Sequence, residues 1–433
     1  MDVLLDEGAE VPLEGFEAKL VLESATDRGL ERLFNHMAEH GANLDVRTEN
    51  GGTLLHSAAG GGSPEIVETL LDHGMDMNEP DDFGWSLLHY AAEMGRAEVI
   101  RFLAEKGADI DTRTMSGKTP FNVAEEFGRR EVAELLASQG ADQSPPKFPL
   151  MEGPYLGQEP PGEEPEIFAL GIVSTNHHSH SAIAFSPDGS EAFWTPMFSR
   201  PEAGYGYGTV FHTRMEDGKW TLPVVAPFSR EMENRCDVPF FSADGNRLYF
   251  ISRRPLQPGG PSGERIWFVE KRNEGWSEPM LLDTPANEMD IHWEFSLDGD
   301  GNLYFGGSSG QDIGAGDIYV SRFIEGAYLE PENLGEKINS ESPEFSPLIA
   351  PDGSYLIFTR VGREGTGLFI SFREKDGTWT EAKDMGPTIN GTGHALCPLL
   401  SPDGKYLFYL TVRDGIEGIY WIDAGIIENL RDS

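Results

Sequence analysis

Two repeats of different length run through this 433-residue chain and together cover most of it. The first has a period of 33 residues: segments that begin at Gly51, Gly84 and Gly117 align without a gap, and a fainter copy precedes them. Apolar residues recur three and four positions apart in each copy, and glycines follow the apolar stretches. This pattern predicts pairs of short helices. One pair cannot bury its apolar face alone, so the copies should stack into a solenoid.

The 33-residue unit resembles the ankyrin repeat. Leu55–His56 and Leu88–His89 match the Leu-His pair of that family. The resemblance implies an ankyrin α-solenoid of four repeats over residues 18–142, preceded by an N-terminal extension at 1–17. It also implies that each histidine braces a turn through backbone hydrogen bonds rather than holding a metal. The closing Gly-Ala-Asn or Gly-Ala-Asp of the family is found at Gly41, Gly107 and Gly140.

An ankyrin domain implies a protein partner, bound through the concave face and the hairpin tips. Aromatic side chains and arginine dominate most protein interfaces. Trp85 has an alternative role, because it could instead cover a neighbouring repeat. The residues that we expect to be exposed for partner binding are Phe83, Trp85, Tyr90, Arg113, Met115 and Lys118.

A proline-rich stretch separates the two repeats. Residues 143–166 hold seven prolines, which exclude a regular helix or a central strand. We interpret 143–149 as the linker between domains. The stretch 150–166 contains apolar side chains, so we expect it to pack against the domain that follows.

The second repeat, of about 54 residues, begins with a hairpin that holds an Asp-Gly turn, as in AFSPDGSEAFW and LLSPDGKYLFY. Asp-Gly between alternating strands is the strongest short hairpin signal. Two further strands follow each hairpin, and four strands repeated radially make a propeller blade. The repeat resembles the TolB-type, WD-like β-propeller and covers residues 150–433. The turn aspartates are Asp188, Asp244, Asp298, Asp352 and Asp403.

Five hairpins predict a five-bladed β-propeller, so the chain belongs to a multidomain class, α plus all-β. The fifth unit ends without a fourth strand. The segment 166–175 precedes the first hairpin, and we expect it to supply that strand and close the ring. Six blades, one of them degenerate, are the alternative.

Polar residues gather where the innermost strands of the blades begin, which is one mouth of the propeller axis. Three interpretations remain open. The mouth is simply polar and wet; or it holds a divalent metal ion on His180, His292 and His394; or it performs carbohydrate chemistry. In the last case, Asp237, Asp290 and Glu344 stand where five-bladed glycosidases carry their acids, and carboxylates about 5–10 Å apart would be required. The whole set is His177, His178, His180, Arg235, Asp237, Asp290, His292, Glu341, Glu344 and His394.

Charge limits the partners. Acidic residues outnumber basic ones 73 to 33, a net charge of −40. Residues 1–142 contain 29 acidic and 11 basic residues, so both domains are acidic. Nucleic acids and anionic membrane surfaces are therefore excluded as partners. The acidic start of the chain shows no secretory signal, which favours a cytoplasmic protein; if a signal had been removed, the periplasm would fit as well.

These features together predict a bacterial, non-catalytic adaptor or sensor. Its ankyrin face would bind a protein, and its propeller mouth would bind a second ligand such as a small molecule or a glycan. The alternative is an enzyme with its site at the propeller mouth: a hydrolase or lyase that acts on a carbohydrate, or a metal-dependent enzyme.

Overall fold

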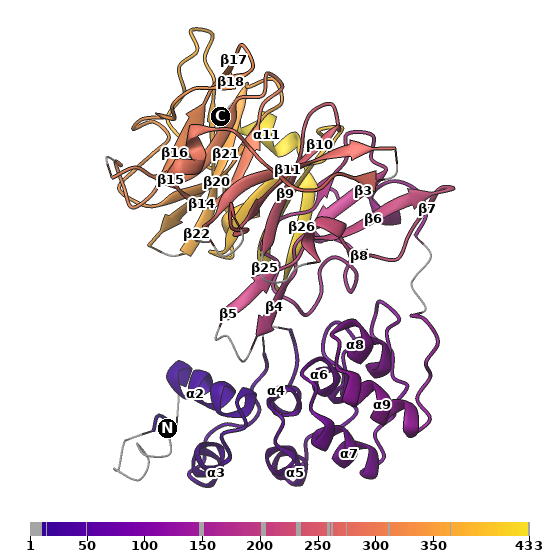
Figure 1. Ribbon diagram of the computed structural model, residues 1–433. Coiled ribbons are helices and arrows are strands. Elements are labelled where there is room, and N and C mark those ends of the chain that lie inside the picture. Colours follow the sequence, from indigo (N-terminus) through magenta and orange to yellow (C-terminus); the bar gives the residue numbers. More distant parts are fainter. Residues whose placement is uncertain are drawn as a thin grey trace. The chain divides into compact units, whose positions relative to one another are not determined.

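The computed structural model describes residues 11–431 except 14, 49, 147–150, 201–204, 231–234, 258–259, 261–262, 274, 311 and 364. The chain divides into two compact units. One comprises Met1–Pro149 with Leu170–Ile172, and the other comprises Leu150–Ala169 with Val173–Ser433. The first unit is helical and the second is built of β-sheets (Figure 1).

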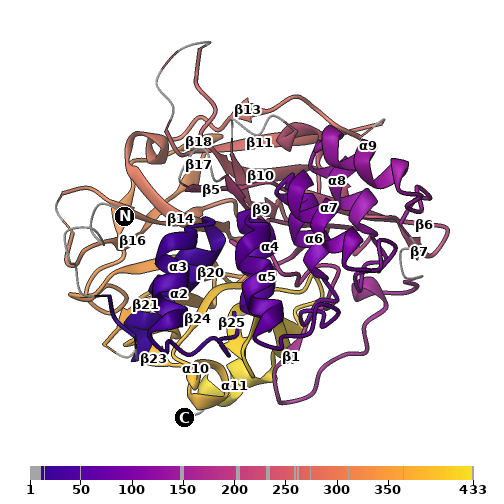
Figure 2. The ribbon, with the colours of Figure 1, turned by 90° about the horizontal axis from the view of Figure 1, so that it is seen from below.

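The helical unit is an ankyrin stack, as predicted. Among the described residues it contains four helix pairs, and each pair packs on the next (Figure 2). The first helices of the pairs contact one another, as do the second helices, so the apolar faces form one continuous core. The helices are α2 (Gly15–Asp27), α3 (Glu31–Glu39), α4 (Leu54–Gly61), α5 (Pro64–Asp72), α6 (Leu87–Glu93), α7 (Ala97–Glu105), α8 (Pro120–Glu126) and α9 (Arg130–Ser138).

The histidines of the repeat brace the helix starts. Helix α6 begins with a capping box, in which Nδ1 of His89 accepts a hydrogen bond of 3.0 Å from the backbone N–H of Ser86. His56 does the same for Thr53 at the start of α4. The Nε2 atom of His89 also lies 3.0 Å from the carbonyl oxygen of Lys118 in the next repeat. Burial lowers the pKa of both histidines to about 4, so each is neutral at pH 7.

The all-β unit forms a five-bladed propeller, counted over the described residues. Its first blade consists of β2 and β3, then β6 with β7 and β8, and carries the extra hairpin β4–β5 (Figure 1). The second blade runs from β9 to β13. Their bounds are β2 (Ala184–Phe185), β3 (Glu191–Trp194), β4 (Met197–Arg200), β5 (Tyr205–Gly208), β6 (Phe211–Glu216), β7 (Lys219–Trp220), β8 (Val224–Val225), β9 (Cys236–Phe241), β10 (Arg247–Ser252), β11 (Arg265–Arg272), β12 (Gly275–Trp276) and β13 (Met280–Leu281).

The third blade is β14-β15-β16-β19 with a separate hairpin β17–β18, and the fourth is β20-β21-β22-β23. The fifth is β24-β25-β26 with β1 at its outer edge. Their bounds are β14 (Asp290–Leu297), β15 (Leu303–Ser308), β16 (Asp317–Ser321), β17 (Phe323–Ile324), β18 (Ala327–Tyr328), β19 (Glu332–Asn333), β20 (Glu344–Ile349), β21 (Tyr355–Gly362), β22 (Gly365–Phe372), β23 (Lys383–Asp384), β24 (Ala395–Leu400), β25 (Tyr406–Arg413), β26 (Ile416–Asp423) and β1 (Glu166–Ile167).

The segment that precedes the first blade completes the last blade. Strand β1 pairs antiparallel with β26, with Glu166 opposite Trp421. Only two residues of the segment 166–175 form a strand, fewer than we expected. Beyond them the chain turns but stays attached, because the hydroxyl of Ser174 accepts a hydrogen bond of 3.0 Å from the N–H of Ile419. The prediction of five blades is confirmed, and the six-bladed alternative is wrong.

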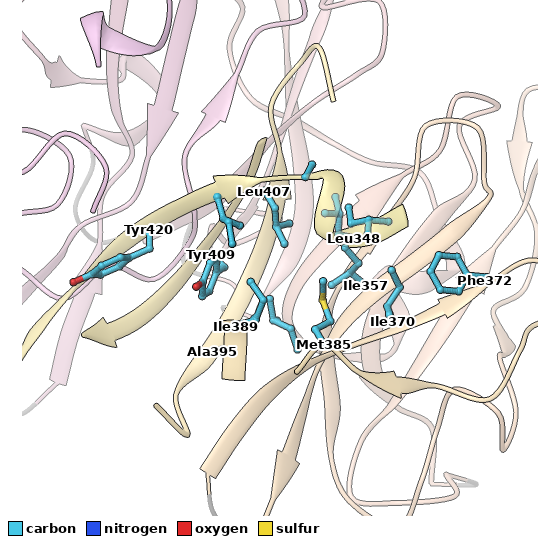
Figure 3. Close-up of a cluster of buried hydrophobic side chains, with 14 residues drawn as sticks. Leu348, Ile357, Ile370, Phe372, Met385, Ile389, Ala395, Leu407, Tyr409 and Tyr420 are labelled. Carbon is cyan, nitrogen blue, oxygen red and sulfur yellow. The ribbon is translucent and has the colours of Figure 1, made fainter. Parts of the chain in front are cut away.

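Apolar layers between neighbouring blades form the core. Between the fourth and fifth blades, Leu348, Ile370, Leu407 and Tyr409 are buried in one cluster (Figure 3). Two short helices cover its edge, α10 (Pro387–Asn390) and α11 (Gly425–Arg431), through Ile389 and Ile427.

Candidate functional site

The innermost strands of four blades carry β-bulges, which position the residues at the propeller axis. The pairing register shifts within β9, β14, β20 and β24. Val238, Ser346 and Cys397 have positive φ angles of 54°, 49° and 58° at three of these shifts. A bulge redirects side chains locally. We give the name axial cluster to His180, Asp237, Glu294, Ser346 and Cys397, which come one from each blade.

A histidine–aspartate pair forms one side of the axial cluster. Nδ1 of His180 lies 2.6 Å from Oδ2 of Asp237, and Nη2 of Arg235 lies 3.7 Å from the same oxygen. Burial disfavours the charged imidazole, but the Asp237 carboxylate outweighs burial and raises the pKa of His180. The sequence-predicted residues His180, Arg235 and Asp237 are therefore brought together.

Glu294 forms the other side and was missed by the sequence analysis. Glu294 is only 7 % exposed. Burial raises the pKa of its carboxyl group to about 8, although hydrogen bonds with Ser346 and Cys397 act to lower it. It therefore carries a proton at pH 7. Ser346 Oγ lies 3.8 Å from Cys397 Sγ, which in turn lies 3.8 Å from the carbonyl oxygen of His180. The signal available in the sequence was an acid between two aromatic residues, Trp293 and Phe295, in the strand before a hairpin turn.

The remaining predicted residues have other surroundings. His178 and His394 share Glu417: Nδ1 of His178 lies 2.5 Å and Nε2 of His394 lies 3.9 Å from its Oε1 atom. The ring of His177 packs against that of Phe198, with centroids 4.6 Å apart. Asp290 and Glu341 are exposed, and the side chain of His292 lies outside what the structure describes.

The three acids proposed for carbohydrate chemistry have three different environments. Asp237 is paired with His180, and Asp290 is exposed. Glu344 is buried, and its Oε1 accepts a hydrogen bond of 2.6 Å from Nε of Arg360. Among the side chains that the structure describes, no group of three or more His, Cys, Asp or Glu residues is arranged to hold a metal ion.

The cavity beside the His180–Asp237 pair is small, about 10 Å³. That is room for about one water molecule. Ion pairs line it, because Glu264 lies 3.9 Å from Arg235 and 2.9 Å from Arg253. This arrangement can share a proton or hold a water molecule.

The ankyrin residues predicted for partner binding differ in their exposure and in their contacts. The expectation that Phe83 and Trp85 are exposed is wrong: they are 1 % and 6 % exposed. The Trp85 indole packs against the rings of His89 and Tyr90, with centroids 5.7 and 5.6 Å apart, so it covers its own repeat. Met115 is 46 % exposed, whereas Arg113 is paired with Asp142 at 2.6 Å and Lys118 with Glu126 at 2.7 Å.

Tyr90 is fixed by a buried carboxylate. Its hydroxyl donates a hydrogen bond of 2.8 Å to Asp81, which also accepts from the N–H groups of Phe83 and Trp85. Burial raises the pKa of Asp81 to about 6, against these hydrogen bonds.

Comparison with known proteins supports the repeat assignment of the first unit. Residues 22–114 match the ankyrin-repeat family in three copies. No curated protein matches the chain. Within the residues that the structure describes, none of the helices has the length and hydrophobicity needed to span a membrane.

Proposed function

We propose that this chain is a non-catalytic interaction protein, an adaptor or sensor. Its ankyrin stack binds a protein partner, and the mouth of its propeller binds a second ligand. The observation that carries this proposal is the internal pairing of the ionisable groups at the propeller axis: Asp237 pairs with His180, and Glu344 pairs with Arg360. Groups held in this way shape and stabilise the ring. Stacked repeats, in contrast, present the extended concave surfaces through which such proteins bind others.

On the ankyrin unit, Met115 and Tyr90 are the contacts that we propose. The neighbouring cations Arg113 and Lys118 already have acidic partners, so they add little net positive charge. Residues 1–142 have 29 acidic and 11 basic residues. An acidic partner would be repelled, so the partner should be basic or neutral.

At the propeller mouth, His178 and His394 are accessible polar groups that lie close to one shared carboxylate. Both side chains are more than a third exposed, and both approach Glu417, whose side chain is largely buried. Two imidazoles around one carboxylate suit a small polar ligand, such as a sugar or an organic acid, which they would contact from outside the ring.

Affinity purification after cross-linking in cells tests the ankyrin part, with the full chain as bait. Met115→Glu places a charge in the proposed contact. Leu20→Glu is the matched control, because Leu20 is also on the ankyrin unit and is 48 % exposed. Partners retained by wild type and by Leu20→Glu but lost by Met115→Glu support the proposal. An identical set of partners for all three proteins contradicts it.

One observation favours the enzymatic alternative. A carboxyl group with a pKa of about 8 beside a histidine–aspartate pair has the properties of a general acid, and Glu294 has that pKa. A panel of polysaccharides and uronates tests this alternative. Turnover by the wild type that is lost in Glu294→Gln, with the fold intact by circular dichroism, would replace the adaptor proposal with a hydrolase or lyase.

A further inference from the structure

The other end of the propeller axis, where the innermost strands finish in their Asp-Gly turns, contains an apolar cavity. Its volume is about 240 Å³. An apolar cavity of about 150 Å³ in a protein core already accepts benzene, so a phenyl or isobutyl group fits here. Each blade contributes the residue at the same register position before its turn: Phe185, Phe241, Leu297, Ile349 and Leu400. We call this cavity the axial funnel.

A larger groove adjoins the axial funnel. It lies between the second and third blades, has a volume of about 870 Å³, and shares Ala243 and Leu297 with the funnel. Its wall is aromatic: Tyr249 and Phe268 come from the second blade and Tyr328 from the hairpin β17–β18. Exposed apolar side chains gather here, since Leu281 and Phe323 also line the groove. We call it the interblade groove.

The interblade groove is acidic. The basic side chains that line it are Arg247 and Lys271, and both are engaged: Arg247 with Glu270 at 3.3 Å, and Lys271 with Glu191 at 3.0 Å. The exposed carboxylates Asp283 and Asp300 add negative charge that these bases do not balance. A segment with apolar and basic side chains complements the groove in both respects.

We propose that the axial funnel and the interblade groove form one docking surface for an extended basic peptide segment of a partner protein. An apolar side chain of that segment enters the funnel. Its backbone continues along the aromatic wall of the groove, and flanking lysines or arginines face Asp283 and Asp300. This surface lies at the opposite end of the inner strands from His178 and His394. Because β9, β20 and β24 are each six residues long, roughly 20 Å separates the two ends. The inference stands independently of the ankyrin partner.

Fluorescence anisotropy with the full chain tests this docking surface. The probe is a fluorescein-labelled peptide, Ser-Lys-Lys-Phe-Lys-Lys-Ser. One control peptide replaces every lysine by glutamate, and a second replaces the phenylalanine by serine. We expect the probe to bind at least tenfold more tightly than either control, and more weakly at high salt. Equal affinity for the probe and either control overturns the proposal. The proposal also fails if the probe shows no binding at about 1 mM, a concentration at which even weak specific binding is detected.

Variants locate the binding. Ala243→Arg blocks the rim common to the funnel and the groove, and should weaken probe binding about tenfold, the effect of losing one well-placed contact. Val224→Arg adds the same charge at a propeller position that is 50 % exposed and lies in neither cavity. Asp283→Asn with Asp300→Asn should reduce the salt dependence, whereas Asp217→Asn, on an exposed turn of the first blade, should not. If Ala243→Arg binds the probe like Val224→Arg, the site is elsewhere and the proposal fails.

Discussion

Glu294 makes the stability of the propeller depend on pH in a way that can be calculated. Its pKa is about 8 in the folded chain and 4.5 for a solvated glutamate. Between these values the folded state holds a proton that the unfolded state has lost. The stabilising effect is complete below pH 4.5 and disappears as the pH rises through 8. Each pKa unit corresponds to about 1.4 kcal/mol, so the whole effect is about 5 kcal/mol.

Most of that change in stability falls within a pH range that is convenient for unfolding experiments. From pH 5 to pH 8, the linkage relation gives a loss of roughly 3 to 4 kcal/mol for the wild type relative to Glu294→Gln. Glutamine keeps the size and polarity of the protonated acid and does not ionise. Taking the difference between the two proteins cancels other buried acids, such as Glu93 of the ankyrin unit, whose pKa burial also raises to about 8.

Urea unfolding followed by tryptophan fluorescence at pH 5, 6.5 and 8 provides the measurement, because Trp194 and Trp421 are buried in the propeller. Glu374→Gln, at an exposed position, controls for the loss of one carboxyl group. A difference between wild type and Glu294→Gln that changes by less than about 1 kcal/mol from pH 5 to pH 8 would mean that burial does not raise the pKa as described. The account of the axial cluster would then be refuted.

Three further predictions concern single contacts. Arg360→Ala leaves the buried carboxylate of Glu344 without its cation and should lower the unfolding free energy by about 3–5 kcal/mol in chemical denaturation. Leu407→Ala opens a cavity in the core between the fourth and fifth blades and should cost about 2–5 kcal/mol in the same assay, against near neutrality for Leu256→Ala at an exposed site. His89→Asn introduces the residue that caps α8 in the next repeat, Asn122, and should make the protein less sensitive to acid. The pKa of His89 is about 4 in the folded chain and 6.5 when solvated, so the wild type loses stability as the pH falls from 6.5 to 4. The melting temperatures at pH 7 and pH 4.5 should therefore differ less for the variant than for the wild type.

Much of the architecture could be predicted because both repeats rest on local chemistry. The Thr-x-x-His pattern at Thr53 and His56 fixes a helix start within four residues. An Asp-Gly turn fixes a hairpin in the same way: Asp244 accepts hydrogen bonds from Ser242 and from the N–H of Asn246. Variants of the helix-start signal recur in the next two ankyrin repeats, as Ser86 with His89 and as Thr119 with Asn122. The period can therefore be recognised from the sequence alone.

The site was harder to predict because it depends on packing between copies. The bulge in β14 brings Glu294 to the axis, and no local pattern distinguishes that bulge from a regular strand. Tryptophan is frequent at protein interfaces, but the ring of Trp85 packs on His89 and Tyr90 in its own repeat. The symmetry of the repeat predicts that His180 and Asp237 lie at one mouth of the propeller. Their direct pairing depends on the shape of the loop before β2, which the repeat does not predict.

Site-specific photo-cross-linking tests most directly whether this chain acts by binding a protein through its ankyrin stack. A photoreactive phenylalanine analogue replaces Met115 in one full-length protein and Leu20 in another, both exposed positions of the same unit. After illumination in cells, the proposed function predicts a discrete heavier adduct from position 115 that contains a second protein, and none from position 20. Equal adducts from both positions, or none from position 115, would contradict it.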